Sequence, residues 1–140
     1  MPVLQKGIAA VANRMPKVIT PRAHAIIDYA TIATWFALGA WFMRRNRWAG
    51  INALICGGAE LATTLLTDFP GGVAHVISFP THGKIDMGLA AMASALPSFM
   101  DFNDEYEAKW FRILGLNITA AGAMTNFHEG RETTRRRRAA

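Results

Sequence analysis

The sequence has little of several features by which a protein function is usually recognised. It contains a single cysteine, Cys56, so no disulfide can form within the chain. Gly57-Gly58 and Gly71-Gly72 lack the neighbours of a phosphate-binding loop, and no serine stands in the context of a nucleophile elbow. Without a recognisable catalytic set, the sequence favours a protein that is not an enzyme.

Charge is also scarce over much of the chain. Only 18% of the residues are charged and 51% are hydrophobic. Four stretches are almost free of charge, at about residues 23–43, 48–66, 85–100 and 110–127. A soluble helical bundle carries charged residues every few positions along its outer faces, yet Thr31–Met43 and Leu89–Met100 carry none. These lengths, roughly 16 to 21 residues, are close to the ~20 that a membrane-spanning helix needs.

The chain contains two copies of one unit. His24-Ala-Ile-Ile-Asp28 begins the first apolar stretch, and His82-Gly-Lys-Ile-Asp86 begins the third. Further on, Arg47-Trp-Ala-Gly50-Ile-Asn52 matches Arg112-Ile-Leu-Gly115-Leu-Asn117. Each copy consists of an apolar segment, a polar turn and a second apolar segment, which predicts a tandem pair of helical hairpins.

These patterns predict an all-α fold, an integral membrane four-helix bundle built from two tandem helical-hairpin repeats. The bundle domain comprises residues 20–128, with the first repeat at about 20–70 and the second at about 78–128. Residues 1–19 form a short interfacial amphipathic helix in this prediction, since their apolar side chains fall mainly on one helical face. Residues 129–140 form a solvated, basic cytoplasmic tail.

The distribution of Lys and Arg predicts the orientation. With four spans, ten of the 15 basic residues lie on the side that holds the N-terminal arm, the middle loop and the tail. By the positive-inside rule, both termini of this multi-pass protein are expected in the cytoplasm. The net charge of +5 then reflects topology and contact with anionic lipids, and nucleic acid is not expected as a partner.

Histidine and aspartate form the pattern that carries chemistry. In both His24/Asp28 and His82/Asp86 a spacing of four residues places the two side chains on one helix face. Two parallel copies related by an axis along the membrane normal bring both pairs to the same depth, where they converge. One interpretation is a site for zinc, iron or manganese. The other is a polar clasp without a metal, and a haem held by His24 and His82 is a third alternative.

Other polar residues of the spans are expected to support packing. Asn52 and Asn117 occupy equivalent places in the two copies and are predicted to hydrogen-bond across helices. Glu60 either handles protons or is a buried carboxylate that is held neutral or bonded to a threonine. Arg135, Arg136, Arg137 and Arg138 are expected to contact anionic lipids or a partner.

At the His-x-x-Ile-Asp segments, followed by Ala40-Trp41-Phe42 and Pro97-Ser98-Phe99, the chain resembles small bacterial four-span membrane proteins with two hairpin repeats, the SPW-repeat type. The likeness covers roughly residues 20–127. The first copy keeps the Trp of the Ser-Pro-Trp signature, and the second keeps the Pro. The resemblance implies the bacterial inner membrane and this architecture, but it implies no activity.

Two functions from different classes follow. The leading hypothesis is a non-enzymatic structural or accessory subunit of a larger membrane assembly. It would have no cofactor, and its partners would be other membrane subunits, anionic lipids or a second copy of the chain. The alternative is a membrane protein that binds a metal or redox cofactor through His24, Asp28, His82 and Asp86. A transporter ranks last, because only Glu60 lies near mid-membrane.

Overall fold

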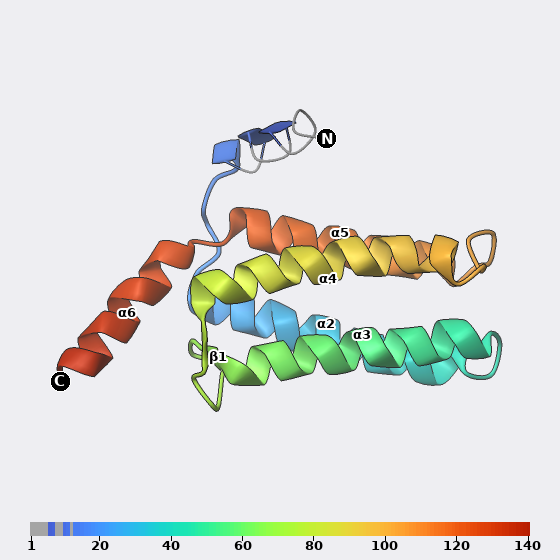
Figure 1. Ribbon diagram of the computed structural model, residues 1–140, viewed down its shortest axis with the longest axis horizontal. Coiled ribbons are helices and arrows are strands. Elements are labelled where there is room, and N and C mark those ends of the chain that lie inside the picture. The colour runs from blue at the N-terminus through green and yellow to red at the C-terminus, as the bar shows by residue number, and fades with distance from the viewer. Residues whose placement is uncertain (1–5, 8–9, 12) are drawn as a thin grey trace.

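The computed structural model describes residues 6–7, 10–11 and 13–140, apart from the side chains of residues 130–134 and 137. Five helices fall within the described residues (Figure 1). They are α2 (Pro21–Phe42), α3 (Arg47–Leu66), α4 (Phe79–Phe99), α5 (Ala108–Met124) and α6 (Phe127–Ala139). The predicted helical fold class is therefore confirmed. The predicted interfacial helix of residues 1–19 falls largely outside the described residues and stays a prediction.

Polar side chains define where the long helices begin. The N-caps are Thr20 for α2, Asn46 for α3 and Ser78 for α4, and each side chain accepts a hydrogen bond from the backbone N–H three residues later. Pro21 and Pro80 stand in the first turns of α2 and α4, where their missing N–H groups cost nothing. The sequence thus fixes both the start of α2 and that of α4, just before their histidines.

The helices are arranged as two hairpins. Helix α2 packs along α3, and α4 packs along α5, with the two hairpins side by side (Figure 1). Two very short strands, β1 (Thr67–Asp68) and β2 (Ile77–Ser78), pair in parallel within the connection from the first hairpin to the second. The pairing holds the end of α3 beside the beginning of α4, which is the end of the molecule where the histidines lie.

A cluster of aromatic side chains fills the opposite end of the hairpins. Trp35, Phe42 and Phe111 are fully buried there. Next to them, Arg45 Nε lies 3.0 Å from Oε1 of the buried Glu107, and this ion pair connects the turn of the first hairpin to the loop of the second. The two hairpins are thus joined at the end remote from the histidines.

Two of the helices, α2 and α3, are long and apolar enough to cross a membrane, with 22 and 20 residues. Large apolar side chains are also exposed outside the core. Examples are Ile26, Trp48, Ile55, Ile113 and Leu116.

The basic tail differs from the prediction. It was expected as a solvated segment from residue 129 onward, but α6 begins at Phe127 and continues to Ala139. The side chain of Asn126 caps this helix by accepting a hydrogen bond from the His128 N–H at 3.2 Å. The Phe127 ring packs at 4.8 Å between centroids against Phe79 of α4. A local cap and one aromatic anchor therefore extend the order into the tail.

Candidate metal centre

The two predicted His/Asp pairs meet at one place between the hairpins. His24 and Asp28 lie on α2, and His82 and Asp86 lie on α4. All four side chains are buried, with exposed fractions between 0 and 5%. Each residue contributes one nitrogen or oxygen atom to a group whose members all lie within 4.8 Å of one another. The i, i+4 spacing set each pair on one face, and the packing of the hairpins turned both faces inward.

The atoms form a compact polyhedron. His24 Nε2 lies 3.3 Å from His82 Nε2. It lies 3.4 Å from Asp28 Oδ1 and 3.3 Å from Asp86 Oδ2. His82 Nε2 lies 3.2 Å from Asp28 Oδ2 and 2.9 Å from Asp86 Oδ2. Four ligands held about 2.0 Å from a tetrahedral zinc ion are separated from each other by about 3.3 Å, so the spacing fits such an ion.

Thr125 determines the tautomer of His24. Its Oγ1 lies 2.7 Å from His24 Nδ1 and 2.6 Å from the carbonyl oxygen of Ala121. A hydroxyl has one proton to donate, and a carbonyl oxygen can only accept. Thr125 therefore donates to Ala121 and accepts from the Nδ1–H of His24. In the neutral imidazole, the lone pair then lies on Nε2, which faces the cluster.

Thr67 does the same for His82. Its Oγ1 lies 2.8 Å from His82 Nδ1 and 2.6 Å from the carbonyl oxygen of Thr63. By the same count of protons, the Nδ1–H of His82 is donated outward and its Nε2 lone pair faces inward. A hydrogen bond from the remote ring nitrogen that fixes tautomer and orientation is the usual support of a histidine that binds a metal.

The carboxylates of the cluster need a positive charge. Asp28 Oδ2 and Asp86 Oδ1 are buried, and neither accepts a hydrogen bond from any described residue. With neutral imidazoles, two carboxylates and two nitrogen lone pairs point into one small volume, and they repel one another. A burial of charge without compensation costs several kcal/mol in folded proteins. Only a cation between these atoms, or protons on the imidazoles, removes the repulsion.

Aromatic rings close the cluster at the outer side. The ring centroid of His24 lies 5.4 Å from that of Phe79 and 5.7 Å from that of Phe127. The ring of Phe69 lies 5.3 Å from that of His82. Gly83 leaves the space for the Phe127 ring, because a Cβ at this position would overlap ring carbons. The site is therefore covered by apolar side chains from three segments and has little access to water.

The two supporting threonines were not identified from the sequence. Thr67 and Thr125 have the same separation as the two histidines, 58 residues. They also have the same backbone partners, since Thr67 pairs with Ile77 and Thr125 with Ile19. Each pairing holds the threonine beside the start of a helix that carries a histidine. A search for residues that share the spacing of the histidines could have found both.

The two predicted packing asparagines behave differently. Asn117 Nδ2 donates to Thr31 Oγ1 at 3.0 Å, so this side chain bonds from α5 to α2 as predicted. Asn52 Nδ2 donates instead to the carbonyl oxygen of Trp48 in its own helix at 2.9 Å. The prediction of a bond between helices was therefore wrong for Asn52, because a carbonyl one turn earlier was nearer than any neighbouring helix.

Glu60 is a third carboxylate close to the site. Its exposed fraction is 3%, and Oε2 accepts no hydrogen bond from any described residue. It interacts electrostatically with Asp28, Asp86 and His82. The predicted bond from a threonine is not seen at Oε2. Glu60 increases the negative charge around the cluster and so adds to its preference for a cation.

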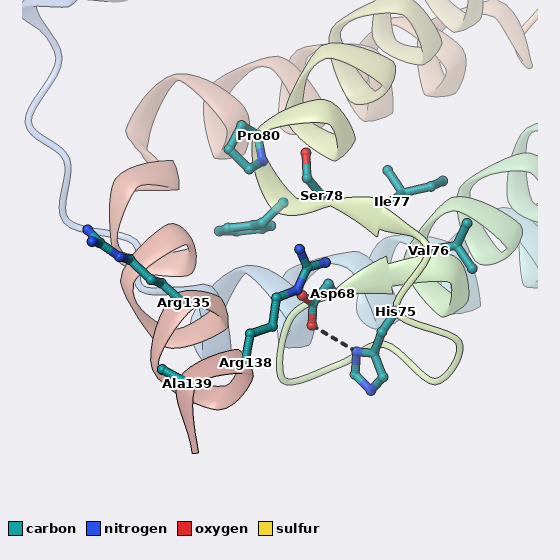
Figure 2. A pocket seen from close by; sticks show the side chains of 10 residues that line it. Asp68, His75, Val76, Ile77, Ser78, Pro80, Arg135, Arg138 and Ala139 are labelled. Carbon is teal, nitrogen blue, oxygen red and sulfur yellow. Dashed lines mark ion pairs between the residues drawn. The ribbon is translucent and has the colours of Figure 1, made fainter.

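The arginines of the tail fall into two groups. Arg135 and Arg138 line a cavity together with Asp68 and His75 (Figure 2). Arg136 is exposed to solvent, and the side chain of Arg137 lies outside the described ones. Their predicted contact with lipids or a partner stays a prediction.

No family model, curated protein or solved structure matches this chain. Its function is therefore inferred from the site. The chemistry of that site is restricted in one respect. With 3.3 Å between His24 Nε2 and His82 Nε2, there is no space for a haem whose iron would bind an imidazole on each face at about 2.0 Å.

Proposed function

We propose that this chain is a four-span membrane protein that binds a divalent transition metal, and that zinc is the ion its site fits best. The ligands are His24, Asp28, His82 and Asp86. The observation that carries the proposal is the convergence of two histidine Nε2 atoms and two carboxylates, at separations of 2.9 to 3.4 Å, with both Nδ1 atoms bonded outward to threonines.

The membrane part of the proposal starts from α2 and α3, which have the length and apolar composition of spans. Helices α4 and α5 lie alongside them over a similar length (Figure 1). Ile113 and Leu116 of α5 are 50 and 69% exposed, as residues that face lipid would be. The four helices together would then cross the bilayer, with both termini and the His/Asp cluster toward the cytoplasmic side.

The identity of the metal follows from the ligand set. Imidazole and carboxylate ligands suit zinc, iron and manganese. Iron and manganese prefer five or six ligands, whereas the inward-facing atoms here number four at the edge length of a tetrahedron with zinc–ligand bonds of about 2.0 Å. Zinc is therefore the first ion to test.

The role of the metal follows from the closure of the site. Catalytic zinc sites keep one position open for water or substrate, while structural sites have four protein ligands. This cluster supplies four ligands and is covered by aromatic rings. A metal here would join α2 of one hairpin to α4 of the other. The proposal thus remains in the non-enzymatic class, and the role of accessory subunit in a larger assembly stays a prediction.

The test is metal analysis of the full chain purified in a mild detergent, after growth with zinc, iron and manganese. We expect about one zinc ion per chain by elemental analysis and a shell of four nitrogen or oxygen ligands at about 2.0 Å by X-ray absorption. The variant with both His24→Ala and His82→Ala should contain no stoichiometric metal. His128→Ala is the control, because His128 is exposed and lies outside the cluster. A wild-type protein that stays metal-free when zinc is supplied would overturn the proposal.

One distance also favours a second candidate, a clasp without metal. The 2.9 Å between His82 Nε2 and Asp86 Oδ2 is the length of a charge-assisted hydrogen bond from a protonated imidazole. In that case, the double histidine variant would lose about 1–3 kcal/mol of stability for each unsatisfied buried partner. Adding zinc to the wild type would not change its unfolding temperature, whereas a metal-binding site would raise it.

A further inference from the structure

A second candidate site lies outside the metal centre. A cavity of about 440 Å³ separates α6 from the segment that leads into α4 (Figure 2). One wall carries Arg135 and Arg138 of α6, and the opposite wall carries His75, Ser78 and Asp68. The volume falls in the range of ~300–1,000 Å³ that is typical of small-molecule sites.

Positive charge predominates in the lining. Arg135 and Arg138 are three residues apart and so share a face of α6. Asp68 is the one acidic side chain among the described residues that line the cavity, and its Oδ1 lies 3.0 Å from Nδ1 of His75. Figure 2 shows Arg138 extending toward Asp68. A guanidinium has five N–H donors, of which one carboxylate engages at most two, so donors remain for a bound anion.

The opposite wall complements these arginines. It includes Ser78 and the first residues of α4, a helix of 21 residues. The backbone N–H groups at the beginning of a helix carry a partial positive charge that favours anions. Ser78 Oγ lies 2.8 Å from Thr81 Oγ1, which keeps the Ser78 hydroxyl at this edge. The cavity is thus bounded by two arginines on one side and by a helix beginning on the other.

We propose that this cavity binds a phosphate group, carried either by an anionic phospholipid headgroup or by a soluble phosphate ester. Arginine pairs bind phosphate through parallel N–H donors, and Arg135 and Arg138 are the residues that would supply them. In the proposed topology the cavity lies at the cytoplasmic membrane surface, where anionic headgroups concentrate. The site does not depend on the metal, and its ligand is chemically different.

The test uses the full chain in detergent and three variants that each remove one positive charge from α6. Arg135→Gln and Arg138→Gln change the cavity, while Arg136→Gln is the matched control because Arg136 does not line it. Binding of phosphatidylglycerol and of phosphatidylcholine is measured by native mass spectrometry. We expect phosphatidylglycerol to bind about tenfold more weakly to each cavity variant, with Arg136→Gln close to the wild type and phosphatidylcholine weak throughout.

A second arm identifies the source of the phosphate. Inorganic phosphate and glycerol phosphate are titrated into the same proteins by calorimetry. Binding of these probes that needs Arg135 and Arg138 would assign the site to soluble phosphates, and binding of the lipid alone would assign it to a headgroup. Equal losses in all three variants, or no binding of any probe to the wild type, would refute the site. Zinc content measured on each sample reports the metal centre separately.

Discussion

Replacing Thr67 or Thr125 with valine tests the feature that distinguishes a metal centre from a simple polar contact. Valine has nearly the shape of threonine but has no hydroxyl, so the Nδ1–H of the neighbouring histidine loses its acceptor. Thr63→Val is the control. Thr63 is also buried, but its Oγ1 donates at 2.9 Å to the carbonyl oxygen of Ala59 in its own helix and contacts no histidine in the hydrogen bonds seen.

The size of the effect has two parts. Loss of a hydrogen bond that supports a metal-binding histidine typically weakens metal affinity by about 10- to 100-fold. This corresponds to about 1.4–2.7 kcal/mol of binding free energy. Independently of the metal, a buried Nδ1–H without an acceptor costs about 1–3 kcal/mol of folding free energy. Each histidine has one such bond, at 2.7 Å for His24 and 2.8 Å for His82.

The assay separates these parts. Zinc affinity is measured by competition with a chelator of known affinity, and unfolding is followed with and without saturating zinc. A ligand that binds only the folded state stabilises it by RT ln(1 + [L]/Kd). We therefore expect the gap between the two unfolding free energies to shrink by about 1.4 kcal/mol for each tenfold loss of affinity in Thr67→Val and Thr125→Val. Thr63→Val should keep the full gap.

Two results would contradict this reasoning. If Thr67→Val and Thr125→Val bound zinc as tightly as Thr63→Val, the Nδ1–H bonds would have no part in holding the imidazoles. If they lost equal stability with and without zinc, the histidines would act as a clasp. The second result would also count against the metal proposal as a whole.

Two further substitutions test the surroundings of the site and the far end of the bundle. Gly83→Ala should destabilise the fold by about 1–3 kcal/mol in thermal unfolding, since its Cβ would overlap the Phe127 ring. Gly88→Ala, with nothing within 4 Å of the new Cβ, should be neutral or stabilising by up to ~1 kcal/mol, and equal effects would contradict the packing of Phe127. Arg45→Ala should cost about 1–3 kcal/mol, because the buried Glu107 loses its partner at 3.0 Å. Full recovery of stability when Glu107→Gln is added would support this cause, and no loss in the single variant would refute it.

The helices and the meeting of the four ligands could be predicted from the sequence for a local reason. The N-caps, the prolines in the first turns and the i, i+4 spacing of His24 with Asp28 all act within a few residues. The second copy of the pattern added the long-range information, since it placed His82 in an environment like that of His24. Both determinants are written in the chain and need no knowledge of the packing.

Features that depend on the distance between helices could not be predicted in the same way. Asn52 and Asn117 match in the sequence, but one bonds to its own helix and the other to a neighbour. An asparagine has a carbonyl one turn earlier within reach in either case, so the choice depends on where Thr31 lies relative to α5. The order of α6 likewise depends on whether Phe127 finds an aromatic surface, which is visible only after the hairpins pack.

The threonines fall between these cases, and this makes their substitution a test of the equivalence of the two halves. Thr67 and Thr125 each follow the last residue of a helix, α3 or α5, with nearly the same backbone angles. Each pairs with the residue before an N-cap and accepts a bond from the histidine in the next helical turn. If the two halves hold one metal in equivalent ways, Thr67→Val and Thr125→Val must lose similar zinc affinity. A large loss in only one of them would mean that a single histidine holds the ion and that the other contributes packing.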